Sequence, residues 1–120
     1  MIIDMSVDAA NVSLDSIGAM MSGGSIELLE ASCNVLATLK LSTPATQAAV
    51  NGELEFNEIR QGIAVTNGRP VTARILTRND DEVLVCDVGD ASSDAVIKLN
   101  TTQIARGSPV QIGSFKLAMP

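Results

Sequence analysis

The sequence VTARILTRNDDEVLVCDV, residues 71–88, contains the clearest β-hairpin signal in the chain and decides the fold class. Residues 71–78 and 82–88 are two short runs rich in aliphatic and β-branched side chains, which favour extended strands. Between them, residues 79–81 read Asn-Asp-Asp, and these residue types favour tight turns. The stretch therefore predicts two antiparallel strands joined by a short connection.

Short runs of the same kind lie on both sides of this hairpin. They are residues 26–29, 35–41, 53–57, 96–99, Ile104 and 110–119. Turn-forming residues separate them, as in the pair Asn67-Gly68. Roughly seven or eight short strands with such turns are typical of two packed β layers, so we predict a mostly β, jelly-roll-like β-sandwich.

In the last of these runs, residues 110–119, the apolar residues change from even to odd positions. Val110 and Ile112 lie on one face of an extended strand, whereas Phe115 and Leu117 lie on the other. A bulge at residues 113–114, Gly-Ser, inserts one extra residue and returns both pairs to the core. We therefore expect an irregular strand at this position.

The N-terminal stretch predicts one short helix, because its apolar residues recur every three or four positions. They are Val7, Ala10, Leu14, Ile17 and Met21. Ser6 can cap the start, and residues 22–25, Ser-Gly-Gly-Ser, end the helix, since paired glycines favour a left-handed cap and a turn. We expect two parts: the helix with a Gly-Gly hinge at residues 1–24, and a β-sandwich domain at residues 25–120.

The apolar face of this helix needs a cover, and two covers stay open. The helix can pack across an open end of its own sandwich, or it can dock on a neighbouring subunit. The core is also unusual, because Phe56 and Phe115 are the only aromatic residues and aliphatic side chains bury less area each. We expect a monomer of modest stability that benefits from partners.

The composition argues against catalysis and against nucleic acid. The chain has no histidine, which removes the commonest general base and a common metal ligand. Its net charge is −6 and its eight Lys and Arg residues are scattered, whereas phosphate binding needs clustered basic side chains. We predict a protein that is not an enzyme, uses no cofactor or metal, and binds no nucleic acid.

Three acidic groups and one Ser-Gly segment remain as places for chemistry, and each has a plainer interpretation. Residues 80–82, Asp-Asp-Glu, and residues 87–90, Asp-Val-Gly-Asp, lack the spacing of a calcium loop and are typical of solvated turns. Glu53 and Glu55 share one strand face, roughly 7 Å apart, where acids mostly serve solvation. Residues 22–25 follow a helix instead of opening one, so they form a hinge and not a phosphate loop. We assign no catalytic residue.

The cysteines and the N-terminal segment bear on the compartment. Cys33 and Cys86 form no CxxC motif, and we expect two buried, reduced thiols, with their pairing left open. Residues 1–5 carry an acid where a signal peptide has its basic region. No apolar run reaches the roughly 20 residues that span a bilayer. We expect synthesis in a reducing cytoplasm and no membrane partner.

Several segments match one known sequence pattern in the same order along the chain. Residues 36–42, Leu-Ala-Thr-Leu-Lys-Leu-Ser, resemble the LATLTLS stretch of a family of small phage and prophage virion proteins. The other matching segments are residues 48–52, a small-residue loop that ends in Gly52, the Arg-Ile-Leu strand at 74–76, and residues 84–89, 99–104 and 107–117, the last containing Ser-Phe. The resemblance covers residues 34–120, with a weaker echo over the helix.

The resemblance implies a structural subunit of a tailed phage, located in the virion. We favour a capsid decoration (cement) protein that binds the major capsid protein from outside, as a homo-oligomer with a trimer favoured. Such a subunit needs only complementary contacts repeated many times, where weak single sites add through multivalency. Two alternatives stay open: a neck, collar or tail protein of the same particle, and, from another class, a cellular peptide-binding β module.

Overall fold

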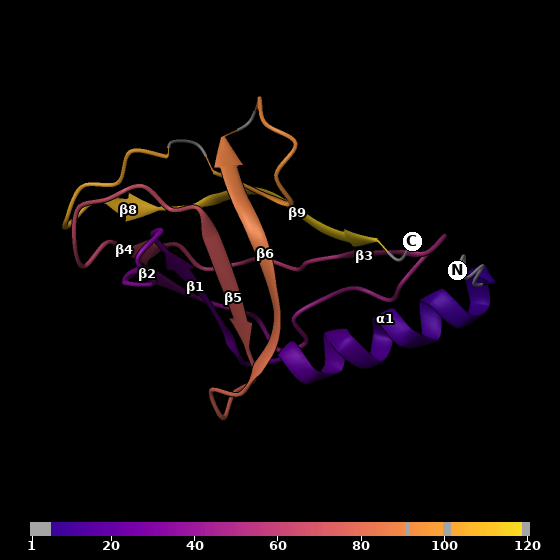
Figure 1. Ribbon diagram of the computed structural model, residues 1–120. Helices are drawn as coiled ribbons and strands as arrows, with labels where there is room; N and C mark the ends of the chain where they lie inside the picture. The colour runs from indigo at the N-terminus through magenta and orange to yellow at the C-terminus, as the bar shows by residue number, and fades with distance from the viewer. Residues whose placement is uncertain (1–5, 91, 100–101, 119–120) are drawn as a thin grey trace.

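One helix and nine strands make up the described part of the chain (Figure 1). The computed structural model describes residues 6–90, 92–99 and 102–118. The elements are α1 (Val7–Met21), β1 (Ser25–Leu29), β2 (Val35–Lys40), β3 (Glu53–Glu55), β4 (Gly62–Ile63), β5 (Thr72–Leu76), β6 (Glu82–Asp90), β7 (Ile97–Leu99), β8 (Pro109–Val110) and β9 (Ile112–Ala118). The predicted mostly β chain with a short N-terminal helix is confirmed.

The strands form two sheets. Seven of them stand in the order β2-β1-β5-β6-β7-β9-β3, and β4 pairs with β8 in a separate two-stranded sheet. Neighbours are antiparallel except β6 and β7, which run parallel. The large sheet is strongly twisted, so β6 and β9 cross steeply in Figure 1. Because both sheets are open, the two-layer, jelly-roll-like packing predicted from the strand pattern is not confirmed.

β5 and β6 form the predicted hairpin, paired antiparallel along their length. The Thr77 N–H donates to the Asp81 carbonyl at 2.8 Å and closes the turn. Asp80 has a φ of 66°, a left-handed conformation that Asp tolerates better than most residues. The Asn-Asp-Asp turn signal is therefore confirmed.

The predicted irregularity in the last strand is also confirmed. In the pairing of β7 with β9, Lys98 lies opposite Ser114 while the next residue, Leu99, lies opposite Ile112. The residue between them, at position 113, is the extra one of a bulge. The bulge turns Phe115 inward, where it is 6 % exposed.

Two short elements differ from the sequence prediction. β4 is an unpredicted strand whose Gly62 and Ile63 pair with β8. The strand predicted at Ile104 is a single bridge, in which Gly68 and Ile104 exchange two backbone hydrogen bonds of 2.9 Å. Both depend on partners far along the chain, so local sequence carries little signal for them.

The core is aliphatic, as the composition predicts. Leu39, Ile26 and Ile75 form a row across β2, β1 and β5, and each is 0 % exposed. From the other end of the sheet, Leu54 of β3 and Phe115 of β9 join the same hydrophobic cluster. The two ends of the large sheet therefore share one core.

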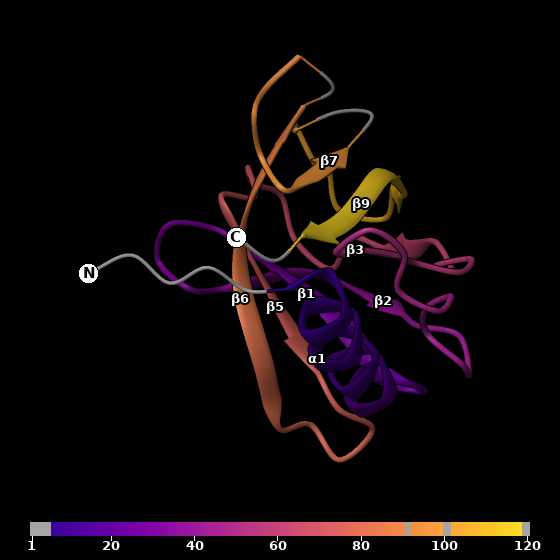
Figure 2. The same cartoon turned by 90° about the vertical axis from the view of Figure 1, so that its right-hand side faces the viewer.

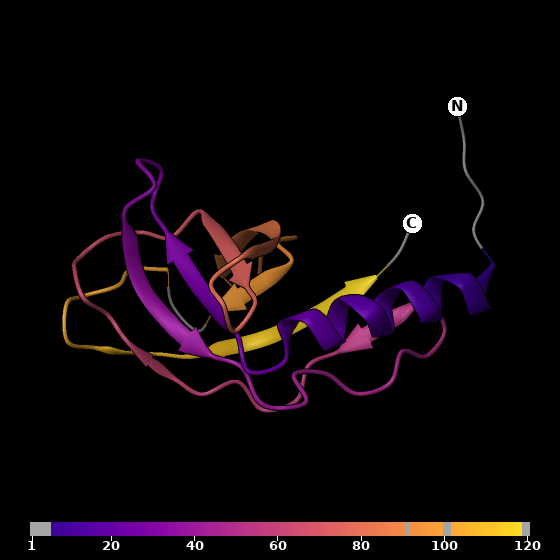
Figure 3. The same ribbon diagram turned by 90° about the horizontal axis from the view of Figure 1, so that it is seen from below.

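Helix α1 packs against its own chain, which is the first of the two covers that the sequence left open. The Ser6 side chain accepts a hydrogen bond from the Ala9 N–H at 3.1 Å, which confirms the cap. Leu14 and Met21 are at most 1 % exposed and belong to the same cluster as the sheet residues. The prediction for Val7 is wrong, since this side chain is 53 % exposed. Only the start of the helix extends beyond the loop that covers the rest of it (Figure 3).

Candidate interaction site

Helix α1 and the loop of residues 43–52 form an extension at one end of the molecule (Figure 3). Two side chains of α1 and that of Ser22, which caps its end, accept hydrogen bonds from backbone N–H groups of this loop. The pairs are Asn11 Oδ1 with Gly52 (2.9 Å), Asp15 Oδ1 with Ala49 (2.8 Å) and Ser22 Oγ with Ala45 (3.1 Å). These bonds satisfy loop backbone groups and fix the helix against the loop, so the helix is held along its length.

Gly18 allows this loop to approach the helix closely. A Cβ atom at position 18 would lie 2.3 Å from Thr46 Oγ1, far inside van der Waals contact. The next nearest side chain, Leu54, would be 3.5 Å away, which is an ordinary contact. Packing therefore demands a glycine at this helix position.

On its exposed side α1 has an uncharged strip, called here the outer helix face, and the exposed Asp8 lies at its end, one turn before Val12. This strip consists of Ala9, Val12, Ser16, Ala19 and Met20, all of them exposed. Val12 is 68 % exposed and Met20 is 54 % exposed. Solvent-facing helix surfaces are usually charged or polar, whereas aliphatic and methionine side chains at helical spacing suit contact with another protein. The outer helix face is the leading candidate for a protein contact.

Sequence reasoning missed this face although a signal for it exists. Val12 and Met20 are eight positions apart, which places them on one side of a helix, with only the small Ser16 between them on that side. The stripe that contains Leu14 is stronger and matches the buried side. A helix with two apolar stripes is consistent with one internal and one external contact.

A groove of about 390 Å³ opens between residues 55–59 and residues 112–116. β3 pairs with β9 at one end of these segments and β4 pairs with β8 at the other end. Phe56 and Phe115 line the groove as a stacked pair, with ring centroids 4.0 Å apart and an interplanar angle of 12°. Its charged residues, such as Glu55, stand at exposed positions, which suits contact with a polar surface.

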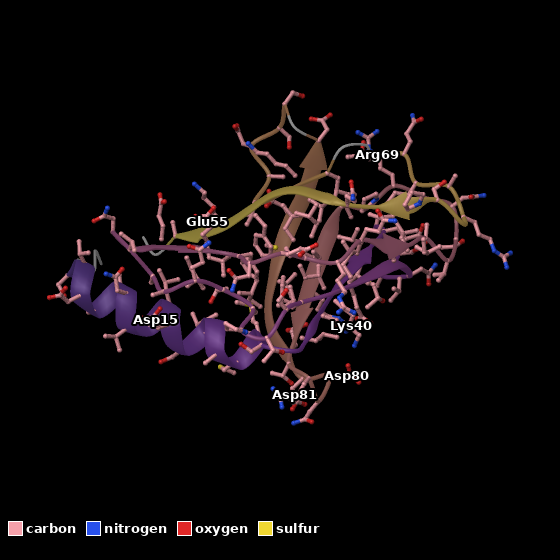
Figure 4. The ribbon with its side chains drawn as sticks, turned by 180° about the vertical axis from the view of Figure 1, so that it is seen from behind. Asp15, Lys40, Glu55, Arg69, Asp80 and Asp81 are labelled. Atoms are coloured by element: carbon pink, nitrogen blue, oxygen red, sulfur yellow. The ribbon has the colours of Figure 1, made fainter. Side chains whose placement is uncertain are left out.

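The acidic groups considered as candidates lie apart from one another. Asp80 and Asp81 are exposed at the tip of the β5–β6 hairpin, whereas Glu55 lies on β3, well away from that tip (Figure 4). Glu53 and Glu55 are both exposed and flank the buried Leu54. Within residues 6–90, 92–99 and 102–118, no three His, Cys, Asp or Glu side chains are grouped so that they can hold a metal ion.

The two acids at residues 87–90 each hold a loop in place. Asp87 Oδ1 accepts a hydrogen bond from the Val96 N–H at 2.9 Å. Asp90 Oδ1 accepts from the Ser92 hydroxyl at 2.7 Å and from the Ser92 N–H at 3.0 Å. These two bonds from Ser92 lower the pKa of Asp90. Both carboxylates therefore serve the connection between β6 and β7.

The end of the helix is as predicted, and its glycines serve close packing. Gly23 has a φ of 73°, the left-handed conformation that favours glycine. Its N–H donates to the Ser42 carbonyl at 3.1 Å, while the Leu41 N–H donates to the Gly24 carbonyl at 3.0 Å. A Cβ atom at Gly24 would lie 1.9 Å from the Leu76 carbonyl oxygen. The segment is thus tied to the chain that follows β2.

The two cysteines differ in their surroundings, and both are free thiols in the structure. Cys33 is exposed, so the prediction of two buried thiols is wrong for this residue. It lies in the β1–β2 connection with a φ of 69°, where the turn directs the side chain away from the core. Cys86 is partly buried, and this burial, together with the neighbouring Asp87, raises its pKa to about 12.

No helix among the described residues has the length and apolar content that crossing a membrane requires. Comparisons with protein families, with curated proteins and with solved structures find no match for this chain.

Proposed function

We propose that this chain is a non-enzymatic structural subunit of a bacteriophage particle, most concretely a capsid decoration (cement) protein. In this role it binds the outside of the major capsid shell, as part of the virion, and stabilises the shell. Two observations support the proposal: the resemblance of residues 34–120 to small virion proteins, and the uncharged outer helix face.

The outer helix face is the observation that carries the proposal. Asn11, Asp15 and Ser22 hold α1 from its other side, so Val12 and Met20 project from a fixed support. A preformed helix loses little conformational freedom when it docks, so a small contact already yields useful affinity. The major capsid protein is the proposed partner for this face.

Repetition makes such small contacts sufficient. A shell presents many identical sites, and an oligomer that engages several of them at once gains apparent affinity without new kinds of contact. We therefore propose a homo-oligomer, with a trimer favoured. The aliphatic core, with two phenylalanines as its only aromatic residues, fits a subunit that gains stability from its neighbours.

A jelly-roll-like β-sandwich is the finer fold that accompanies this proposal. Leu54 of β3 and Phe115 of β9 share a hydrophobic cluster with Ile26 of β1 and Leu39 of β2. These strands stand at opposite ends of the sheet order, and their shared cluster supports this proposal. A sandwich would need the two halves of the sheet to face each other across that cluster.

Binding to purified shells of the encoding phage tests the proposed function. The chain is mixed with shells, the mixture is sedimented, and electron microscopy locates the added density. We expect co-sedimentation, density outside the shell, and a trimer in sizing experiments. Absence of co-sedimentation would contradict the proposal.

The same experiment separates the two alternatives. Density at the neck, collar or tail, together with a larger ring in sizing, would favour a different place in the particle. Binding to cellular peptides without any binding to particles would favour the peptide-binding β module. Either outcome would replace the assignment as a cement protein with one of these two functions.

A further inference from the structure

Among the described residues, the first half of β6 has an open strand edge. β6 pairs with β5 from Glu82 to Asp87, whereas β7 joins its other side only from Val88 to Asp90. No strand that the structure describes pairs with residues 82–87 on that side, and this half of β6 forms a margin of the sheet in Figure 2. The Val88 N–H donates to the Val71 carbonyl, on the β5 side, at 3.2 Å. Because backbone groups alternate in direction along a strand, the N–H and carbonyl of Val85 point to the open side.

The two end strands of the large sheet are covered by the chain itself. Segments between β2 and β5 donate to the outer edge of β2, and the segment before β3 bonds to Glu55 of β3 and to Asn57 just after it. From N–H donor to carbonyl acceptor, these bonds are Arg60 to Lys40 (3.0 Å), Val65 to Leu36 (2.8 Å), Gln47 to Glu55 (2.9 Å) and Asn57 to Ala45 (2.9 Å). In the part of the chain that the structure describes, the open half of β6 has no such cover.

The open segment has the side chains of an interior strand. Residues 83–86 are Val-Leu-Val-Cys, a strongly β-forming run without lysine or proline. Val85 at its centre is 52 % exposed. Its single irregularity, at Val83, lies at one end of the segment. Natural edge strands are usually protected by charged side chains, proline or a bulge. Residues 84–86 have none of these, so this part of the edge is suited to receive another strand.

Acidic side chains surround this edge. Residues 80–82 are Asp-Asp-Glu and residues 87–90 contain two further aspartates, while no lysine or arginine occurs between them. Arg74, which lies opposite Val85 on β5, is engaged by Glu27 in a salt bridge and two hydrogen bonds. Acidic side chains therefore predominate at both ends of the edge, although Arg69 lies close enough to Asp90 to help lower its pKa and Lys98 lies opposite Gly89.

We propose that the open half of β6 binds an extended segment of another protein, which adds to the sheet as a strand. The chemistry of the edge specifies β-branched residues at alternate positions of that segment and Lys or Arg at both of its ends. Backbone hydrogen bonds to Val85 supply affinity, the aliphatic side chains supply packing, and the acids select the partner. This inference goes beyond the proposed function, because it assigns a second surface with its own ligand chemistry.

A second copy of the chain is a poorer occupant of this edge. Antiparallel pairing about Val85 places residues 80–82 of one copy beside residues 88–90 of the other, at both ends of the pair. Like charges that face each other across strands are destabilising. The net charge of −6 on each chain adds to this repulsion.

Synthetic peptides test the inference on the purified full chain. The peptide KKVTVTVKK carries the specified centre and flanks, and EEVTVTVEE has the same centre with opposite flanks. Titration calorimetry measures both affinities, and hydrogen exchange by NMR follows single amides. We expect the lysine-flanked peptide to bind at least about tenfold more tightly than the glutamate-flanked one. The Val85 amide should gain protection, while the Cys86 amide, which faces β5, should change little.

Variants at one residue show whether the peptide sits on this edge. Val85→Lys places a charge against the lysine-flanked peptide and should weaken binding at least about tenfold. Val85→Pro removes the outward N–H without removing a bond to β5 and should have a similar effect. Val85→Thr keeps both shape and N–H, and Val65→Lys makes the lysine change at another valine, 63 % exposed, so both should bind as the unmodified chain does.

Equal affinity for both peptides, or binding that Val85→Lys leaves unchanged, would overturn the inference. Because phage shells take no part in these measurements, this failure is distinct from a failure of the virion assignment. If the chain binds shells but not the peptides, the virion assignment stands and the inference about the β6 edge is overturned.

Discussion

The carboxylate of Asp15 on α1 accepts a hydrogen bond from the backbone N–H of Ala49 at 2.8 Å, across 34 positions of sequence. A helix of 15 residues is only marginally stable in water without tertiary contacts. The bonds from Asp15, Asn11 and Ser22 to the loop, together with the burial of Leu14, therefore decide whether the outer helix face is presented in a fixed position.

Removal of the Asp15 carboxylate should destabilise the chain. Asp15→Ala leaves the partly buried Ala49 N–H without its acceptor, and hydrogen bonds to charged groups contribute about 1.5–3 kcal/mol. We expect the free energy of unfolding, measured by urea titration, to fall by about 1–2 kcal/mol. Ser16→Ala, at the next and exposed helix position, is the matched control and should change it by less than about 0.5 kcal/mol. Equal effects of the two substitutions would contradict the contact.

A double-mutant cycle tests the close approach of Gly18 to Thr46. Gly18→Ala alone should destabilise the chain by about 1 kcal/mol or more, because the new methyl group meets Thr46 Oγ1 at 2.3 Å. In a Thr46→Ala background that oxygen is absent and the nearest remaining atoms are at ordinary contact distance. There the same change should stabilise, by up to about 1 kcal/mol of helix propensity. Thermal unfolding of the four proteins gives the coupling energy between positions 18 and 46. If Gly18→Ala changed the stability in the same direction in both backgrounds, the close contact of Gly18 with Thr46 would be contradicted.

The stacked pair of Phe56 and Phe115 should act as a unit. Each phenylalanine replaced alone by leucine loses the ring contact, and together the pair should show a coupling energy of about 0.5–1.5 kcal/mol. Chemical denaturation of the two single variants and the double variant provides this value. If the losses in the free energy of unfolding were strictly additive, the two rings would not stabilise each other.

Thiol labelling should separate the two cysteines. At pH 8 the exposed Cys33 should react quickly with Ellman's reagent. Cys86 has a pKa of about 12, because burial and Asp87 disfavour its thiolate, so its reaction should be slow and should accelerate as pH rises toward 12. Cys33→Ser should abolish the fast phase, and denaturant should release one further thiol. Two fast thiols in the native chain would contradict this environment of Cys86.

Local signals in the sequence predict much of the fold. The Asn-Asp-Asp turn, the cap at Ser6 and the parity change around Gly113 each depend on neighbouring residues, and all three are confirmed. The bulge is the most informative, because a single extra residue in β9 explains how Phe115 returns to the core.

Other features depend on contacts that single-sequence reasoning does not reveal. β4 forms because Gly62 pairs with Val110, which is 48 positions later in the sequence. A strand of two residues is too short to show a periodic pattern of apolar residues. Val7 matches the buried stripe yet is exposed, because the loop covers the helix only as far as Ala10, beside Gly52. The open edge of β6 requires the sheet order, since β7 covers only part of it.

Thermal disassembly of phage shells, with and without the added chain, tests the central claim most directly. The unmodified chain should raise the temperature at which shells disassemble. The double variant Val12→Lys with Met20→Lys, which charges the outer helix face at two exposed positions, should fold normally and fail to protect them. An equal rise with the double variant would contradict the role of that face. No rise with the unmodified chain would contradict the assignment of this protein as a capsid cement.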